Sequence, residues 1–393
     1  MISTVGIVTR NRVASLVACV ESYLEKCRRH GRNPEFVVTD DSLDTEAQDH
    51  ARGALQSLGN HFGAQIRYAG RREKNRFAEA LARESAVPPK IIRFALFGDD
   101  RCALTTGANR NSLLLDTVDT FVLSVDDDTR CRIAAAPDAE DAVAFFSGYD
   151  PTEFWYFADR ASADASIYFV DVDALRCHEA LLGNAVANVD DPAANGRVAI
   201  TLHGLVGDPG MNSPRYYLGM SGPSRERLVA SPDAYRSAFR SREVLRTVRR
   251  PTVSAGPFCM TTFFGFDNRL ALPPFFPVQR NADGIFGLVL QKCVEGSHVA
   301  FLPSFLQFFC IDQSTRGRSQ LMTSGRTREV CGWPTSSSPR FSRMTRGVPR
   351  ARMRRGWSSS ASICAGSGRK PRARMPTCMF PVIWLHIVRP ETR

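Results

Sequence analysis

Three consecutive carboxylates, Asp126, Asp127 and Asp128, offer the clearest chemistry in this sequence. They follow residues 120–125, a short apolar run rich in β-forming residues that predicts a central strand buried on both faces. Because side chains alternate along a strand, we expect Asp126 and Asp128 to point the same way and Asp127 the opposite way. Two convergent carboxylates at the end of a buried strand suit a hard divalent cation that also holds phosphate oxygens. A solvated turn after a strand would have the same sequence, so the neighbouring elements have to decide.

The first 42 residues predict a strand, a helix and a second strand. Residues 4–12 read as a strand that runs into a polar loop, and an amphipathic helix with Leu16 and Cys27 on its apolar face follows. The second strand, residues 35–39, ends at Asp40 and Asp41. This pattern implies parallel pairing and a right-handed crossover. Carboxylates at the end of the second strand lie where open α/β sheets bind ligands.

The segment between residues 65 and 118 predicts a third strand and several helical stretches. Residues 65–68 are the strand, residues 77–86 are helical, residues 91–97 are a further apolar run, and residues 112–118 form a helical face. A basic cluster follows the third strand and consists of Arg71, Arg72, Lys74 and Arg76. It could face phosphates or simply be the solvated start of a helix.

Four short motifs follow one another along residues 4–130. They are TRNR at 9–12, VVTDDS at 37–42, GANRN at 107–111 and SVDDDT at 124–129. In this order and spacing they resemble the nucleotide-sugar-binding half of a family-2-type glycosyltransferase with a GT-A fold. No single motif is specific, and the order of all four carries the resemblance.

The resemblance implies a role for each matching residue. The positions that would bind the nucleotide sugar are Thr9, Arg12, Asp40, Asp41, Gly107, Arg110 and Asn111. Asp40 or Asp41 would contact the nucleoside, and Asp126 and Asp128 would hold Mg²⁺ or Mn²⁺ against the diphosphate. Arg110, near a helix start, could donate to a phosphate, or it could pair with Asp126 or Asp127 and hold the acidic loop.

A second informative stretch, residues 259–294, contains one more candidate carboxylate. An aromatic-rich segment leads into Asp283, which sits near the start of an amphipathic helix where the macrodipole stabilises a negative charge. The resemblance implies that this residue is the base that deprotonates the acceptor hydroxyl. The usual Glu-Asp pair is incomplete, because Ala282 precedes Asp283. A helix N-cap would look the same in sequence.

The region between these stretches, residues 131–250, carries weaker patterns. We expect strands at 154–157 and 166–172, a short helix at 173–182 with His178 on its surface, and a Gly- and Pro-rich loop at 203–214 that could line an acceptor site. Residues 225–250 read as a basic, packed surface helix rather than a nucleic-acid-binding element.

The net charge of +11 is unevenly distributed. The chain has 51 basic and 40 acidic residues, of which 17 basic and two acidic ones follow residue 312, so residues 1–312 are mildly acidic. Residues 313–393 also lose all periodicity. They read either as a disordered basic tail or as an out-of-frame translation of a G+C-rich gene.

The remaining composition predicts a soluble cytoplasmic protein. No apolar run approaches the roughly 18 residues of a membrane span, no signal peptide precedes the first strand, and the 11 scattered cysteines contain no C-x-x-C pair. We therefore expect reduced thiols in a cytoplasm rather than a disulfide framework or a zinc site.

The patterns predict an α/β fold, and the resemblance implies that it is GT-A-like, a Rossmann-like mixed sheet flanked by helices. Residues 1–130 would form the nucleotide-sugar half, residues 131–312 the acceptor half, and residues 313–393 a tail. The expected function is a metal-dependent, inverting transfer of a sugar, with a UDP-sugar as the expected donor, a hydroxyl-bearing acceptor and no nucleic-acid partner. The alternatives are a non-catalytic nucleotide- or sugar-binding scaffold and a sugar-phosphate nucleotidyltransferase. The latter usually has a glycine-rich loop after its first strand, and TRNR contains no glycine.

Overall fold

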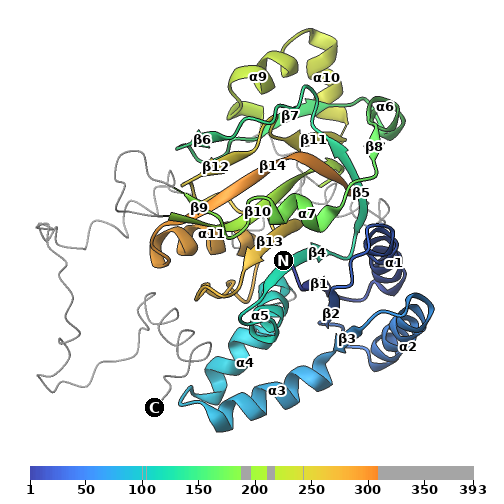
Figure 1. Ribbon diagram of the computed structural model, residues 1–393, viewed down its shortest axis with the longest axis vertical. Coiled ribbons are helices and arrows are strands. Elements are labelled where there is room, and N and C mark those ends of the chain that lie inside the picture. Colours follow the sequence, from blue (N-terminus) through green and yellow to red (C-terminus); the bar gives the residue numbers. More distant parts are fainter. Residues whose placement is uncertain (100, 103, 187–195, 210–216, 242, 309–393) are drawn as a thin grey trace, which may run out of the picture. The chain divides into compact units, whose positions relative to one another are not determined.

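The computed structural model describes residues 1–308 except 100, 103, 187–195, 210–216 and 242. The predicted tail therefore lies outside the described residues. The predicted α/β class is confirmed: a large mixed sheet with helices against both faces (Figure 1). Its central strand order is β3-β2-β1-β4-β13-β10-β14-β12-β6.

The first four strands of this order are parallel and follow the predicted β-α-β pattern. The strands are β1 (Thr4–Thr9), β2 (Glu35–Asp40), β3 (Ile66–Ala69) and β4 (Phe121–Asp126). The helices between them are α1 (Val13–Arg29), α2 (Thr45–Phe62), α3 (Arg71–Glu84), α4 (Pro89–Phe97) and α5 (Thr106–Asp116). The apolar run at 91–97 belongs to α4, and the helical face predicted at 112–118 is the second half of α5.

The sheet continues without a break into the second half of the chain, because β13 pairs antiparallel with β4. The strands on this side are β5 (Thr129–Ala135), β6 (Ala144–Phe146), β7 (Glu153–Tyr156), β8 (Phe169–Val170), β9 (Ala185–Val186), β10 (Gly196–Gly207), β11 (Val244–Thr247), β12 (Thr252–Ser254), β13 (Phe263–Asp267) and β14 (Ser297–Phe308). The helices are α6 (Arg160–Ser166), α7 (Ala174–Glu179), α9 (Gly222–Leu228), α10 (Pro232–Arg240) and α11 (Ala282–Cys293).

Two apolar cores cover the two faces of the central strands. Along β4, Leu123 and Val125 pack with the buried face of α1, whereas Val122 packs on the opposite side with Phe286 of α11. This alternation is why apolar residues of the run at 120–125 lie on both faces of the strand, as expected of a strand covered on both sides. A strand buried in this way holds the residue at its carboxyl end, Asp126, in a fixed position.

Several predictions for residues 131–250 are wrong. The strand predicted at 166–172 is only Phe169–Val170, because α6 occupies the chain up to Ser166. The first part of the predicted loop 203–214 continues β10, and residues 210–216 lie outside the described residues.

The helix predicted at 225–250 is instead two short helices and a strand. Proline at the second position of α9 and at the first position of α10 starts two separate helices. The aromatic side chains of α10, Tyr235 and Phe239, are exposed, whereas Val244 and Leu245 are buried in β11. The apolar residues thus follow two different periodicities that resemble one helix when they are read together.

The histidine predicted on the surface, His178, is buried. Its Nδ1 lies 2.8 Å from the Thr201 hydroxyl, and its ring meets that of His203 edge-on with centroids 4.4 Å apart. The Nδ1 of His203 lies 2.8 Å from the Ser304 hydroxyl. Burial lowers the pKa of His203 to about 4 and that of His178 well below its usual value, so both rings are neutral at neutral pH.

Because His178 and His203 are buried and neutral, we expect acid to destabilise the fold. In the unfolded chain a histidine binds a proton below about pH 6.5, whereas in the folded protein His203 stays neutral down to about pH 4. The free energy of unfolding therefore decreases as pH falls from 6.5 toward 4. His203→Asn removes one proton-linked group and keeps a partner for Ser304. We expect the dependence of its unfolding free energy on pH in this window to be smaller than that of the original chain, by about 1.4 kcal/mol per pH unit. Urea titrations of both chains across the window measure this difference, and equal pH slopes would contradict it.

Candidate functional site

The residues predicted to do chemistry meet at the carboxyl edge of the parallel strands. Thr9 at the end of β1 is in register with Asp40 at the end of β2, and Val8 is in register with Asp126 at the end of β4. Parallel strands end at the same edge of a sheet, which is where α/β folds bind ligands.

The three carboxylates do not alternate as predicted. Strand β4 ends at Asp126, and Asp127 and Asp128 form the turn into β5. We call these three residues the acidic turn. As a result Arg12 reaches two of them, with its Nη1 2.7 Å from Asp128 and 3.2 Å from Asp127. The hydroxyl of Thr9 donates to Asp127 at 2.6 Å. Thr9 thus holds the acidic turn, and the turn is a buried, ordered structure rather than a solvated one.

Arg110 pairs with the remaining carboxylate. Its Nη2 lies 2.5 Å from Oδ1 of Asp126, and its side chain is 6% exposed. This is the loop-holding arrangement, one of the two that the sequence left open. The buried helix α5 fixes the guanidinium against Asp126.

Arg12 and Arg110 do not fully offset the cost of burying the negative charge of the acidic turn. Burial raises the pKa of Asp127 to about 7 against the opposing effect of Arg12. Burial also raises the pKa of Asp126, which Arg110 opposes and Asp128 reinforces. Both shifts express the cost of burying charge in one place. A bound cation would relieve that cost.

The two predicted nucleoside carboxylates are buried and hydrogen-bonded inside the protein. Asp40 accepts from the backbone N–H of Ser42 at 2.7 Å and from the hydroxyl of Tyr68 at 2.7 Å. Asp41 forms a buried ion pair with Lys74 and accepts from the hydroxyl of Thr105 at 2.8 Å. Their side chains shape the edge of the site, and a contact with a nucleoside stays a prediction.

Three residues that organise this edge were not singled out from the sequence. Lys74 appeared only as one member of a basic cluster, and it is buried rather than facing solvent. Thr105 and Asn109 had no signal, since a threonine and an asparagine near a helix start usually act as caps. Asn109 instead donates to the backbone carbonyls of Thr9 and Thr39 at 3.1 and 2.8 Å, and so ties α5 to the ends of β1 and β2.

The G-x-x-R-N motif positions the site through packing. Asn111 donates to the carbonyls of Ala95 and Phe275, each at 2.9 Å, and accepts from the N–H of Phe275 at 2.7 Å. A Cβ on Gly107 would lie 1.9 Å from the carbonyl oxygen of Phe276. These contacts clamp the segment before α11 onto the start of α5, and they bring distant parts of the chain to one place.

Gly107→Ala should therefore destabilise the protein. The new methyl meets a backbone oxygen, which cannot rotate away, and we expect a loss of at least about 1–3 kcal/mol in the free energy of unfolding. Gly53→Ala is a matched control, because Gly53 lies in α2, where an added methyl would meet open space, and should gain about 0.5–1 kcal/mol. Urea denaturation measures both, and a neutral Gly107→Ala would contradict the clamp.

The fourth predicted carboxylate, Asp283, lies in the first turn of α11 near this cluster. The cap position itself is Asn281, with φ 67°, and the side chain of Asp283 accepts from the N–H of Gly284 at 2.9 Å. Asp283 is half-buried, and it is close enough to add, after burial and the nearer charges, to the rise in the pKa of Asp126. Asp283 therefore acts electrostatically on the predicted metal ligand, and it is not the N-cap residue.

Asp126 and Asp128 would supply two carboxylates to a divalent cation, and a ligand would have to supply the rest of its coordination shell. Oδ1 of Asp128 is buried and has no hydrogen-bond partner within the described residues, and the side chain of Asp126 is 27% exposed. The described part of the chain contains no cluster of three or more His, Cys, Asp or Glu side chains that would hold a metal by itself. Phosphate oxygens and water would have to complete the coordination.

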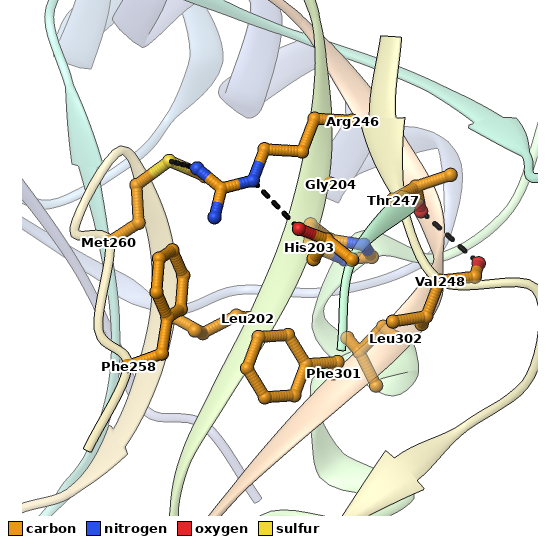
Figure 2. Close-up of a pocket in the computed structure, with 11 residues that line it drawn as sticks. Leu202, His203, Gly204, Arg246, Thr247, Val248, Phe258, Met260, Phe301 and Leu302 are labelled. Atoms are coloured by element: carbon orange, nitrogen blue, oxygen red, sulfur yellow. Dashed lines mark hydrogen bonds between the residues drawn. The ribbon is translucent and has the colours of Figure 1, made fainter. Parts of the chain in front are cut away.

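A cavity in the second half of the chain does not provide a substrate site. It lies beside β10, between Arg246, Phe258 and Phe301 (Figure 2). The Arg246 guanidinium lies over the Phe258 ring at 4.4 Å and pairs with Asp150 at 2.6 Å. The cavity volume is about 10 Å³, enough for about one water molecule.

Comparisons with known proteins do not establish the function of this chain. No protein-family model matches the chain, and no curated protein is significantly similar in sequence. Among solved structures, mannosyl-3-phosphoglycerate synthase from Rubrobacter xylanophilus is similar at 14% identity and a TM-score of 0.33, over 85% of this chain and 78% of that one. Core-mannan synthase A from Aspergillus fumigatus, in its Mn/GDP form, is similar at 9% identity and a TM-score of 0.29, over 76% and 72%. Scores this low do not establish a common fold.

No helix within the described ranges combines the length and apolarity needed to cross a membrane. The seven cysteines in that part of the chain form no disulfide.

Proposed function

We propose that this protein transfers a sugar from a nucleotide diphosphate sugar to a hydroxyl acceptor with the help of a divalent cation. The observation that carries this proposal is the buried acidic turn at the end of β4, with a separate carboxylate, Asp283 of α11, near enough to act on Asp126 electrostatically. An acidic turn alone would suit many metal sites. A second carboxylate beside it supplies the base that a hydroxyl acceptor requires.

The residues divide into a donor group and an acceptor group. Asp126 and Asp128 would hold Mn²⁺ or Mg²⁺, which when bound neutralises the charge that develops on the departing diphosphate. Arg110 keeps the Asp126 carboxylate in place. Asp283 takes the proton of the acceptor hydroxyl, and inversion at the sugar carbon follows if that hydroxyl attacks opposite the diphosphate.

The donor we propose is a UDP-sugar, with GDP-sugars as the second set to test. The full chain should release nucleoside diphosphate slowly from a cognate donor when Mn²⁺ is present, with water as the acceptor. Metal-dependent nucleotide binding without any release would favour the scaffold. Pyrophosphate formation from a nucleoside triphosphate and a sugar phosphate would favour the nucleotidyltransferase.

A further inference from the structure

The guanidinium of Arg12 sits on the carboxylates that the proposed cation needs. Its Nη1 contacts Asp128 at 2.7 Å and Asp127 at 3.2 Å. The two carboxylates are almost completely buried, at 9% and 1% exposure, whereas the side chain of Arg12 is 51% exposed. The half-exposed guanidinium of Arg12 therefore covers a pair of buried carboxylates at the carboxyl edge of the parallel strands.

Arg12 and Arg110 hold the same acidic turn in different ways. Arg110 is buried in α5 at 6% exposure and lies 5.9 Å from the centre of the Phe275 ring. Moving Arg110 would leave its own charge buried without its carboxylate partner, which is strongly unfavourable. The guanidinium of Arg12 is already half hydrated, so it can move into water when another cation takes its place beside the buried carboxylates.

The backbone beneath Arg12 is anchored, so its side chain can move alone. The preceding residue, Asn11, has φ 56°, and its N–H donates to the Ser42 hydroxyl at 2.8 Å. Arg12 itself is the residue before α1 and makes no side-chain cap to the helix. Among the residues that the structure describes, a change of rotamer would break its ion pairs with Asp127 and Asp128.

We propose that Arg12 is a resident counter-ion, which a divalent cation displaces from Asp128 and which the nucleotide diphosphate then takes up. This inference rests on the proposed function and adds to it a coupling between metal and nucleotide. Bound alone, the metal competes with Arg12 and leaves the guanidinium without a partner. Bound with a diphosphate, the released guanidinium gains a bidentate anion. Metal and nucleotide therefore strengthen each other's binding, and linkage makes the effect equal in both directions.

The test measures Mn²⁺ affinity on the full chain from the free-Mn²⁺ electron paramagnetic resonance signal, with and without UDP or GDP. In the original chain the cognate nucleotide should tighten Mn²⁺ binding by at least about tenfold. Arg12→Gln should bind Mn²⁺ alone more tightly than the original chain and should show a smaller nucleotide effect, the remainder coming from phosphate oxygens that bind the metal directly. Arg29→Gln removes the same charge from the far end of α1, where Arg29 contacts Asp171, and should behave like the original chain.

Each other outcome has a defined meaning. If Arg12→Gln binds Mn²⁺ alone equally or more weakly, or keeps the full nucleotide effect, the counter-ion role is wrong and the proposed function stands. If the original chain and Arg12→Gln both fail to bind Mn²⁺ with either nucleotide, the metal site fails and the inference fails with it. Circular dichroism of each variant separates these results from misfolding.

Discussion

Asp128→Asn is expected to reduce turnover of the nucleotide sugar on the order of 10³-fold. The substitution keeps the size of the side chain and removes the charge that would bind the cation, which supplies several kcal/mol of stabilisation to the departing diphosphate. The Oδ1 atom of Asp128, buried without a partner within the described residues, is the atom that this role requires. The rate of nucleoside diphosphate release at saturating Mn²⁺ measures the effect.

The control for this variant is Asp138→Asn, which makes the same chemical change on an exposed residue with φ 52°, a conformation that asparagine adopts readily. It should retain full activity. Full activity in Asp128→Asn would rule out Asp128 as a metal ligand. Asp128→Asn also removes the shorter of the two ion pairs of Arg12, so the fold of the variant has to be checked by its unfolding transition.

Asp283→Asn is expected to lower kcat by about 10²–10⁴-fold while nucleotide and metal still bind. The amide cannot accept the proton of the acceptor hydroxyl, and general-base catalysis contributes about this much. Because Asp283 lies beside the acidic turn rather than in it, the donor site should remain intact. Steady-state kinetics with a cognate acceptor, together with metal-dependent nucleotide binding, separate the two effects.

The chain offers a close control in Asp233→Asn. Asp233 occupies the second position of α10, as Asp283 does in α11, but its side chain is 94% exposed. Both substitutions remove the favourable interaction of a carboxylate with the helix dipole, worth about 0.3–1 kcal/mol. Only Asp283→Asn should alter kcat. A kcat that is unchanged in Asp283→Asn would exclude it as the base.

The parallel half of the fold could be predicted because its signals are local. Each of its strands is a short apolar run, and each helix has one apolar face, so β1, β2, β3 and β4 lie within about two residues of their predicted ranges. For Arg110 the sequence left two alternatives, a phosphate contact or a pair with Asp126 or Asp127, and the structure has the pair with Asp126. The fold of residues 131–250 could not be read, because short strands such as β7 and β11 pair with partners far away in the chain. Their apolar residues reflect those partners rather than a local period.

The predictions for individual residues of the site were wrong for a related reason. Strand alternation predicts the direction of Asp127 only while the strand continues, and β4 ends one residue earlier. Lys74 looked like a surface cation because a single buried ion pair leaves no pattern in sequence. Its partner Asp41 is 33 residues away. The orientation of Asp127 and the burial of Lys74 both depend on contacts with residues far away in the chain.

The central claim is that Asp126 and Asp128 form a metal-dependent site for a nucleotide diphosphate. Calorimetric titration of the full chain with UDP and with GDP, in the presence and absence of Mn²⁺, tests it most directly. The account predicts binding of one nucleotide that requires Mn²⁺ and disappears in Asp126→Asn and in Asp128→Asn, with Asp138→Asn unaffected. Binding that is independent of Mn²⁺, or that survives both site substitutions, would contradict it.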